Sequence, residues 1–590
     1  MSKGKFSSSD NYQGLQEAIE AIMREDGSDV EVDLVALPPE PSVLTDEEEG
    51  DDDKIMTNDF PKDIPGNVEV FINRNDDEWD SSDEELLATT AAKKRRTDNL
   101  PGPRWRKCHP TYDSIIFDEN NVQERREKMV SDLKDLNPVA IFEKMFDNEI
   151  ISMIIQNSKL YSAQKNKHDF DITEEQLKTF LGILLLTGYH TLPRERLYWS
   201  LDEDCNVPIV SKAMTRNRFL EIKKFLHFCD NEVAAETSDK MFKIRPLGDI
   251  LMKKYMQWGI FHTNLSIDES MIKYFGRHPS KQFIRGKPVR FGYKNWMVSS
   301  ADGYCYAFDI YCGKSPSTNI VNNEPLGSRV VKTLLNKLGA DPKDHIVFFD
   351  NFFTSFGLLR ELRETGYRAT GTVREGRTGK CPLIPIKEMK KKNRAEYDYR
   401  FDTTNKILFV RWLDNSVCTM GTNYDSVLPL GKVKRWSSAE KKKTDVDIPQ
   451  VFVSYNKGMG GVDQADQSIS LYRTSIRGKK WWWVLFTYML DLTVSNCWRL
   501  HTLCNDVKMD QLQFRRSIAR HYLRQETDRR SRPTASIVPS LQFDGIGHFP
   551  QKLNKQLRCT VCHNKARWQC KKCIKTLCIE KLCFETFHTE

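Results

Sequence analysis

The sequence predicts an α/β protein of several domains, and three observations lead to this prediction. The chain has 590 residues, whereas a single hydrophobic core usually stops growing at about 250 to 300 residues. Helical periodicity dominates residues 120–259 and returns after residue 467, and strand patterns alternate with helices in between. Six of the 15 cysteines fall within the last 32 residues, which indicates a separate metal-binding module rather than a disulfide framework.

Residues 1–105 form the first segment, which the sequence predicts to be disordered. Residues 1–88 contain 26 acidic and 6 basic side chains, a net charge of −20, which leaves +27 for residues 89–590. Such a composition has too little apolar surface to offset the entropy of folding. The run Lys93–Arg96 fits a nuclear localisation signal and, equally, a solvated basic patch.

The rest of the chain is basic and rich in aromatic residues, which suits a polyanionic partner such as DNA. Lysine and arginine release counterions from phosphates, and aromatic rings stack on exposed bases. The same surplus of charge also aids solubility, so charge alone does not identify DNA. The first residues lack a signal-peptide apolar region and no apolar stretch is long enough for a membrane span, so we expect a soluble intracellular protein.

Residues 120–259 are predicted to form the first part of a helical domain. Apolar side chains recur at helical spacing from Pro138 onward, and Thr173-x-x-Gln176 can cap the helix that runs to Leu185. Further amphipathic segments lie at Arg216–Phe228 and Ile250–Gly259.

Residues 260–375 are predicted to form the first part of a catalytic core. The expected order is strand, strand, strand, helix, strand, helix, strand, as in an RNase H-like sheet. These elements are expected at Leu265–Asp268, Phe291–Ser300, Gly303–Cys312, Ser328–Leu338, His345–Asp350, Ser355–Arg363 and Arg368–Val373.

Three further segments follow the first part of the core. Residues 376–431 are predicted to be an inserted β-rich subdomain with a small sheet that includes Ile407–Trp412, and a basic linker follows it. Residues 432–466 return to the core, and Asp463 and Asp466 lie three apart, on one helix face. Residues 467–540 are predicted to complete the helical domain.

Three acids occur where an RNase H-like sheet converges its catalytic groups. Asp268 is expected to end the first strand, Asp350 to end the fourth, and Asp463 to open a helix. Carboxylates suit Mg²⁺ or Mn²⁺, and two such ions can activate the attacking and leaving oxygens in phosphodiester chemistry. Each aspartate alone is equally explained as a turn or cap residue, so the prediction depends on their joint arrangement.

The three segments that carry these acids resemble the catalytic blocks of the piggyBac transposase superfamily. They read SIDE at Ser266–Glu269, FDNFFT at Phe349–Thr354, and YNKGMGGVDQADQ at Tyr455–Gln467. From about residue 120 onward the chain is most similar to the piggyBac transposable element-derived proteins. The resemblance implies that Asp268, Asp350 and Asp463 hold two metal ions and that Asp466 is also required.

The resemblance further implies a reaction, an assembly and a location. The reaction would be cut-and-paste transposition at TTAA targets through a hairpin intermediate, carried out on the terminal repeats of double-stranded DNA by a homodimer in the nucleus. The discontinuous helical domain would serve dimerisation and DNA binding. A domesticated nuclear DNA-binding protein without mobilising activity is the alternative, because members of both kinds can keep these residues.

Two segments are candidates for DNA contact. Basic and aromatic residues interleave between residues 277 and 294, and we expect Arg285, Lys287 and Arg290 to bind DNA; a solvated hairpin is the competing interpretation. Lys479, Lys480 and Trp481 form the second candidate, since the resemblance matches Trp481 to a tryptophan that stacks on DNA. The adjacent Trp482 and Trp483 are also explained as core residues.

Residues 556–590 are predicted to be a zinc module. Tetrahedral Zn²⁺ takes Cys and His ligands, and two CxxC pairs with further Cys and His nearby are a specific signal. Seven ligands exceed one site and fall one short of two, so His563 is the candidate eighth, and we expect two zinc ions. The resemblance implies that the module is a two-zinc cross-brace that binds the element's terminal DNA; a chromatin protein is the alternative ligand. The ligands are Cys559, Cys562, Cys570, Cys573, Cys578, Cys583 and His588.

Overall fold

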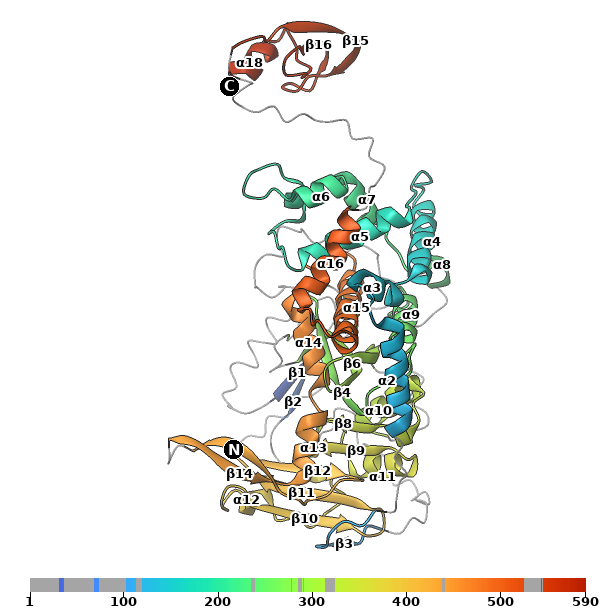
Figure 1. Ribbon diagram of the computed structural model, residues 1–590, viewed down its shortest axis with the longest axis vertical. Coiled ribbons are helices and arrows are strands. Elements are labelled where there is room, and N and C mark those ends of the chain that lie inside the picture. The colour runs from blue at the N-terminus through green and yellow to red at the C-terminus, as the bar shows by residue number, and fades with distance from the viewer. Residues whose placement is uncertain are drawn as a thin grey trace. The chain divides into compact units, whose positions relative to one another are not determined.

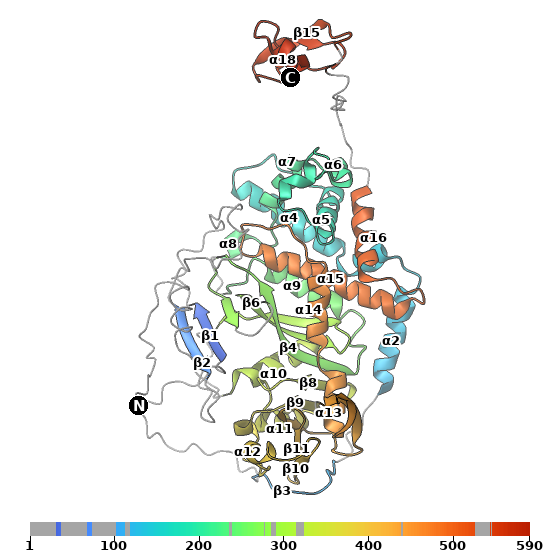
Figure 2. The ribbon, with the colours of Figure 1, turned by 90° about the vertical axis from the view of Figure 1, so that its left-hand side faces the viewer.

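The computed structural model divides the chain into two compact units, Met1–Thr527 and Asp528–Glu590, which are drawn in Figures 1 and 2. None of the helices in the described part of the chain is long and apolar enough to cross a membrane. The structure describes residues 31–36, 68–73, 102–112, 119–234, 239–276, 278–284, 289, 291–313, 324–437, 441–524, 543 and 545–589.

The first unit is built on a mixed β-sheet with helices around it (Figure 2). In its centre β4 runs parallel to β8 and β8 parallel to β9, while β6 is antiparallel to both β4 and β7. The order of core elements predicted from the sequence is confirmed, with the short strand β5 (Lys281–Ile284) in addition. The five central strands, in spatial order, are β7 (Cys305–Ile310), β6 (Phe291–Ser300), β4 (Asn264–Lys273), β8 (Ile346–Phe349) and β9 (Arg368–Thr372).

Helices connect and follow these strands. α10 (Leu326–Leu338) joins β7 to β8, α11 (Phe356–Glu364) joins β8 to β9, and Ser355 caps α11 by accepting the N–H of Leu358. α12 (Ile386–Met389) precedes the inserted strands, in the lysine-rich part of the insertion, and α13 (Gln450–Gly458) and α14 (Gly461–Leu471) follow them.

The inserted strands extend the central sheet instead of forming a small sheet of their own. They are β10 (Tyr397–Asp402), β11 (Ile407–Leu413) and β12 (Val417–Thr422), and β12 pairs with β9 through Met420 and Thr372. This pairing satisfies the backbone groups that β9 would otherwise expose as an edge strand. The expected basic linker is instead a separate two-stranded ribbon, β13 (Gly431–Ser437) with β14 (Lys442–Ile448).

Two strands lie within the residues for which the sequence predicts no fold. β1 (Glu31–Ala36) pairs with β2 (Val68–Asn73) and also with β5, so this hairpin extends the other end of the sheet. Valine occurs twice in each segment, together with isoleucine and phenylalanine in β2, and these residues favour strands even in an acidic region. β3 (Trp105–Arg106) pairs with β10.

The helices come from two separated stretches of the chain that share one core. At the crossing of α5 and α16 a Cβ on Gly182 would lie 2.8 Å from the Cβ of Tyr522, so only glycine fits. Thr173 caps α5 as predicted, by accepting the N–H of Gln176. The predicted helix from Pro138 is two helices, since Asp147 caps a new one. They are α2 (Glu119–Leu133), α3 (Pro138–Met145), α4 (Asn148–Gln164), α5 (Glu174–Thr187), α6 (Pro208–Ala213), α7 (Arg216–Phe225), α8 (Asn231–Ala234), α9 (Arg245–Tyr255), α15 (Trp483–Cys504) and α16 (Gln511–Arg524).

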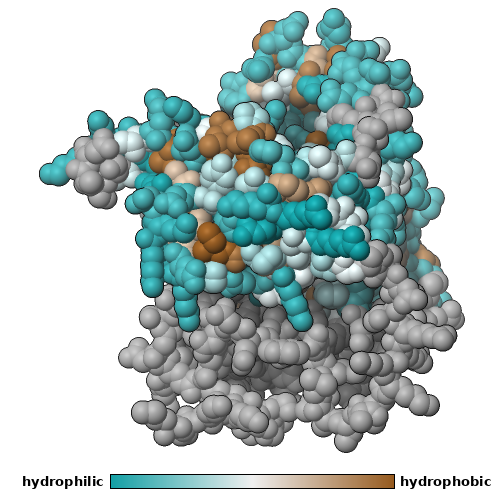
Figure 3. All heavy atoms as spheres, turned by 90° about the horizontal axis from the view of Figure 1, so that it is seen from below, coloured by the Kyte–Doolittle hydropathy of each residue, from teal (hydrophilic) through white to brown (hydrophobic). Residues whose placement is uncertain are grey.

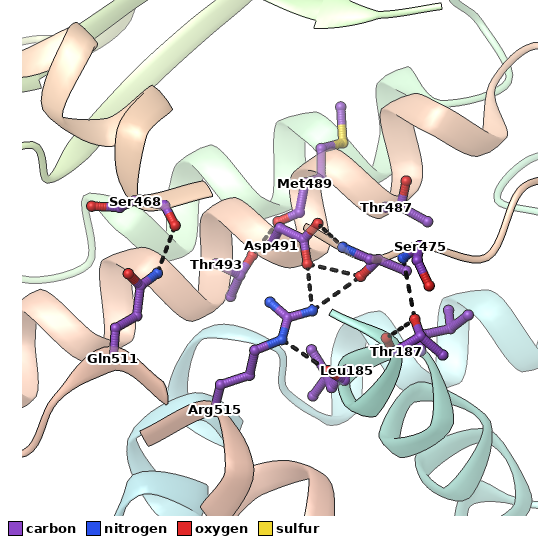
Figure 4. Close-up of polar contacts among 12 residues, drawn as sticks. Leu185, Thr187, Ser468, Ser475, Thr487, Met489, Asp491, Thr493, Gln511 and Arg515 are labelled. Atoms are coloured by element: carbon purple, nitrogen blue, oxygen red, sulfur yellow. Dashed lines mark hydrogen bonds and ion pairs between the residues drawn. The ribbon is translucent and has the colours of Figure 1, made fainter. Parts of the chain in front are cut away.

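A buried ion pair joins these two stretches (Figure 4). Arg515 of α16 lies 2.7 Å from the carboxylate of Asp491 in α15, and both side chains are almost completely buried. Arg515 also donates to the carbonyl of Leu185 in α5, while Thr474 donates to Asp491 through its backbone N–H and its hydroxyl. The network therefore ties α5, α15 and α16 to the segment that leads from α14 to Trp481.

The second unit has a very small core. It consists of β15 (Pro550–Arg558), β16 (Lys565–Cys570) and α18 (Cys583–Thr589). Four of the six residues in its buried cluster are cysteines, and the other two are Ala566 and Leu577. Little apolar surface is available here to stabilise a fold without metal ligation.

Candidate functional site

Asp268 lies in the middle of β4, which differs from the expectation that it ends the strand. The antiparallel pairing with β6 continues to Lys273, and this extends β4 beyond the acid. The parallel pairing with β8, however, stops at Ile267 and Phe349. Asp268 and Asp350 are therefore the next residues on two neighbouring strands, immediately past the last parallel pair.

Strand geometry places these two acids on one face of the sheet. Successive side chains along a strand point to opposite faces. Ser266 is the register partner of Phe348, and Asp268 and Asp350 each follow two residues later. The structure thus brings the first two predicted acids together.

Tyr455 of α13 lies close to both acids. Burial raises the pKa of Tyr455 above its usual range, and the carboxylates of Asp350 and Asp268 raise it further, while a hydrogen bond with Thr372 opposes them. The hydroxyl therefore stays protonated at neutral pH and is a hydrogen-bond donor beside the carboxylates. Tyr455 is the first residue of the segment Tyr455–Gln467, but it was not among the predicted site residues.

The third acid-bearing segment is α14, which packs on β4 and β6 (Figure 2). A Cβ on Gly461 would lie 1.9 Å from the carbonyl oxygen of Ser300, so glycine allows the helix to begin against the end of β6. Asp463 is exposed in the first turn of this helix. Asp466, one turn later, is half-buried and accepts a hydrogen bond of 2.6 Å from Ser270 Oγ.

Ser270 connects Asp466 to the same face that carries Asp268. It lies two residues beyond Asp268 on β4, and its hydroxyl is also 3.1 Å from that of Tyr488 in α15. Burial raises the pKa of Tyr488 well above its usual range, and the Asp466 carboxylate raises it further. The two acids of α14 therefore differ: Asp463 faces solvent, while Asp466 is hydrogen-bonded to the sheet.

Glu269, which follows Asp268, does not join the acids. Its side chain points to the opposite face and pairs with Lys294 at 3.3 Å. The Lys294 ammonium lies over the rings of Trp296 and Phe352, 4.1 and 4.8 Å from their centres. Glu269 is thus neutralised away from the candidate site.

The donors on the acidic face are oxygens, which fit Mg²⁺ or Mn²⁺. Asp350 is oriented by the backbone, since Phe352 N–H donates to its Oδ1 at 2.9 Å. Among the described residues, only the Cys/His groups of the second unit bring three or more ligand atoms within 4.8 Å of one another. The carboxylate oxygens of Asp268, Asp350 and Asp463 therefore do not all lie within 4.8 Å of one another, as the ligand atoms of each Cys/His group do.

The candidate DNA-contact residues have different environments. Arg285, Lys287 and Arg290 lie outside the described residues. Lys479 is exposed, whereas Lys480 donates to the carbonyls of Lys224 and Leu226 and so fixes the local fold.

Trp481 is buried, and the expectation of a ring available for stacking is not met in this structure. It is 6% exposed, and its ring lies 4.4 Å from that of His278, which comes from the segment between β4 and β5. Trp482 and Trp483 are each 1% exposed. All three tryptophans therefore belong to the core of the first unit in this conformation.

The second unit contains two groups of metal-ligand type. One is Cys559, Cys562, Cys578 and Cys583, and the other is His548, Cys570, Cys573 and His588. Within each group the ligand atoms lie within 4.8 Å of one another. Along the chain, the members of one group alternate with those of the other. Cys₄ and Cys₂His₂ sets of this kind could hold zinc.

The eighth member is His548 rather than His563. His548 Nδ1 lies 3.5 Å from Cys570 Sγ and 3.4 Å from Cys573 Sγ, whereas His563 belongs to neither group. His563 instead occupies the turn after the first CxxC pair, with a left-handed backbone at φ 59°. His548 precedes that pair by eleven positions, outside the usual ligand spacing.

Cys562 shows why a cation would be favoured at its group. A backbone hydrogen bond at Asn564, together with the neighbouring thiols, lowers the pKa of Cys562 to about 6. Its thiolate, the form that binds metal, is therefore favoured at neutral pH.

Comparisons with known proteins agree with this fold. Residues 137–498 match the family model described as Transposase IS4. The chain is 40% identical over 458 residues to human PiggyBac transposable element-derived protein 3, covering 77% of this chain and 76% of that protein. It is 34% identical over 548 residues to human PiggyBac transposable element-derived protein 2, covering 90% and 89%.

A solved structure shares the fold. The cryo-EM structure of the piggyBac transposase synaptic complex with hairpin DNA superposes with a TM-score of 0.55 at 21% identity, covering 76% of this chain and 96% of that chain. Fold and family model define a protein of the transposase class. More closely, the chain belongs to the piggyBac transposase superfamily and is similar to its transposable element-derived members.

Proposed function

We propose that this protein is a DNA transposase whose cleavage and joining site is formed by Asp268, Asp350 and Asp463. The single observation that carries the proposal is the position of Asp268 and Asp350 side by side past the last β4–β8 pair, on the face covered by α14. The strand order β7-β6-β4-β8-β9, in which only β6 is antiparallel to the other four strands, supports an RNase H-like core.

The three carboxylates would hold two Mg²⁺ or Mn²⁺ ions, which when bound supply activation of the attacking oxygen and stabilisation of the leaving oxygen. The protein's own residues provide the alignment. β4 and β8 fix Asp268 and Asp350, and Asp466 holds α14 to Ser270, one helical turn after Asp463, the proposed third ligand. The Tyr455 hydroxyl lies beside Asp350 and Asp268, whose carboxylates raise its pKa, so it stays protonated and adds no negative charge to the acids.

The proposed reaction is cut-and-paste transposition at TTAA targets. A water oxygen attacks a phosphodiester at the element's end and releases a 3′-OH, which then attacks the opposite strand and closes a hairpin. The opened end is finally joined to new DNA. We propose that a nuclear homodimer performs it, and that Arg285, Lys287, Arg290 and Lys479 contribute to DNA binding.

The second unit would hold two zinc ions in its Cys₄ and Cys₂His₂ groups. Lysine and arginine residues are frequent and exposed along β15 and the start of β16, which supports terminal-repeat DNA as its ligand. A chromatin protein is the alternative partner of this unit.

The test is excision of a donor flanked by the inverted repeats that surround the gene, in Mg²⁺. Asp268→Asn and Asp350→Asn are expected to abolish excision, while Glu269→Gln, on the other face of β4, retains most of it. Excision that persists in Asp268→Asn and Asp350→Asn contradicts the proposed site.

A second function is favoured by one finding, since the similar human proteins are named as transposable element-derived. A domesticated protein would bind DNA through the same fold without mobilising it. Full repeat binding without excision by the wild-type protein would support this second function.

A further inference from the structure

The ribbon β13–β14 is a separate two-stranded sheet that projects from the first unit. In Figures 1 and 3 it extends at the left, and in Figure 3 its described surface is largely hydrophilic. Its strands pair from Gly431 with Ile448 at the base to Ser437 with Lys442 near the turn. Residues 438–440 of the turn lie outside the described part.

The two faces of this ribbon differ in chemistry. Val433, Val446 and Ile448 pack into the hydrophobic cluster of the inserted strands and α13. The opposite face carries Lys432, Lys434, Trp436 and Lys443, all exposed. Only one face is therefore needed for folding, and the other is available for a partner.

Charge is unequal along the exposed face. Near the base, Lys432 lies opposite Asp447 and Lys434 opposite Asp445, so the cross-strand pairs are close to neutral. Toward the turn, Trp436 lies opposite Lys443, which Lys441 and Lys442 precede in sequence. The far end is thus positive, and it carries an indole that is 59% exposed.

The ribbon is braced so that this end is held in place. Asp414, in the turn between β11 and β12, accepts hydrogen bonds from Arg435 at 2.8 Å and from Arg394. Both guanidinium groups keep the pKa of Asp414 below its usual range against the opposing effect of burial. Arg394 also donates to the carbonyl of Trp436 at 3.2 Å. An exposed tryptophan on a braced strand is a feature of recognition surfaces.

The ribbon also connects directly to the acid-bearing helices. β14 ends at Ile448, α13 begins at Gln450, and α14 with Asp463 follows. A partner bound along the ribbon is therefore attached to the same segment that positions the candidate catalytic acids.

We propose that the exposed face of the β13–β14 ribbon binds duplex DNA through Lys434, Lys443 and Trp436, a proposal that rests on the proposed function. The two lysines contact phosphates, and the indole packs against the sugar and base edges of a groove. Two-stranded β-ribbons fit the major groove of DNA, and lysine contacts with phosphates supply affinity without sequence preference. Lys443 attracts the polyanion at the positive end, and Lys434, two residues before Trp436 on the same exposed face, extends the contact toward the base.

The test measures binding of a labelled duplex by the full, zinc-loaded chain without Mg²⁺, across a range of salt concentrations. Lys434→Gln with Lys443→Gln is expected to weaken binding about tenfold near 0.1 M salt and to reduce the slope of log K against log salt by roughly 1.8, since each phosphate contact contributes about 0.9. Trp436→Ala is expected to weaken binding several-fold with an unchanged slope. A melting temperature equal to that of the wild type shows that each variant folds.

The matched control is Lys343→Gln with Lys387→Gln, which removes the same charge from two exposed lysines that belong neither to the ribbon nor to the helical domain. An equal loss in this control, or unchanged affinity and slope in the ribbon variants, overturns the proposal and leaves the proposed function standing. A loss confined to single-stranded DNA also overturns it. Wild-type protein that binds no duplex overturns the proposed function together with this proposal.

Discussion

The two units differ in what fixes the side chains of their candidate metal sites. In the first unit, Asp268 and Asp350 lie on central strands inside a large apolar core, so their positions are set before any cation binds. In the second, four of six buried residues are themselves potential ligands, and the fold and the site are nearly the same thing. We therefore expect loss of the proposed metal ions to affect activity in the first unit and folding in the second.

Removal of zinc gives the largest expected difference between the units. We expect a strong chelator to unfold residues 545–589, because structural zinc contributes on the order of 10 to 16 kcal/mol in small domains, while the first unit keeps its melting temperature. Hydrogen exchange of the full chain, followed by mass spectrometry, measures both units at once. Cys562→Ser should reproduce the effect and Cys205→Ser, outside both groups, should not; protection that survives chelation contradicts the comparison.

The buried pair Arg515–Asp491 provides the next largest effect, this time in the first unit. Arg515→Met leaves the Asp491 carboxylate buried without its cation, and we expect a loss of about 3 to 5 kcal/mol in the free energy of unfolding. Chemical denaturation measures it. The exposed pair Lys392–Glu396 is the control, since Glu396→Gln should leave the free energy of unfolding nearly unchanged. Equal effects of the two variants would show that the network in Figure 4 does not hold the helices together.

Acid should destabilise the first unit through histidines that its core keeps neutral. Burial lowers the pKa of His227 and of His278 to about 3. Because the unfolded chain takes up these protons near pH 6.5, the stabilisation is complete above that pH and declines as pH falls toward 3, by about 2 kcal/mol per histidine at pH 5. The melting temperature, measured between pH 7.5 and pH 5, tests this prediction. His227→Gln should flatten the dependence, and a variant at the exposed His168 should leave it unchanged.

The sequence predicted those parts of the fold that local periodicity controls. A short alternating segment located β4 and a continuous apolar run located β8, each followed by an acid, and the strand register places Asp268 and Asp350 next to each other. It could not show that Trp481 is covered, because His278 reaches it from a segment two hundred residues away. His548 was missed for a similar reason, since its distance in sequence from the CxxC pairs hides its proximity in space.

Composition led to wrong predictions for two highly charged segments that form strands. The lysine-rich stretch around residues 432–448 resembles a linker, yet alternate positions such as Val433 and Val446 supply the buried face of a ribbon. The acidic N-terminal region contains the β1–β2 hairpin for the same reason: a few β-branched residues pair with an available sheet edge. Average charge does not reveal a periodicity of two in so short a segment.

The smallest expected effect tests whether the first unit's site depends on single contacts as well as on its core. Ser270→Ala removes the donor to Asp466, and we expect about 1.5 kcal/mol of lost stability with roughly a tenfold fall in excision, because α14 is no longer fixed to β4. Ser470→Ala, on the exposed side of the same helix, is the matched control. A positioning role predicts slower excision with an unchanged Mg²⁺ dependence, whereas a shifted Mg²⁺ dependence would mean that Asp466 itself binds the cation. If neither changes, the core alone is sufficient to align Asp463, and the contrast between the two units becomes sharper still.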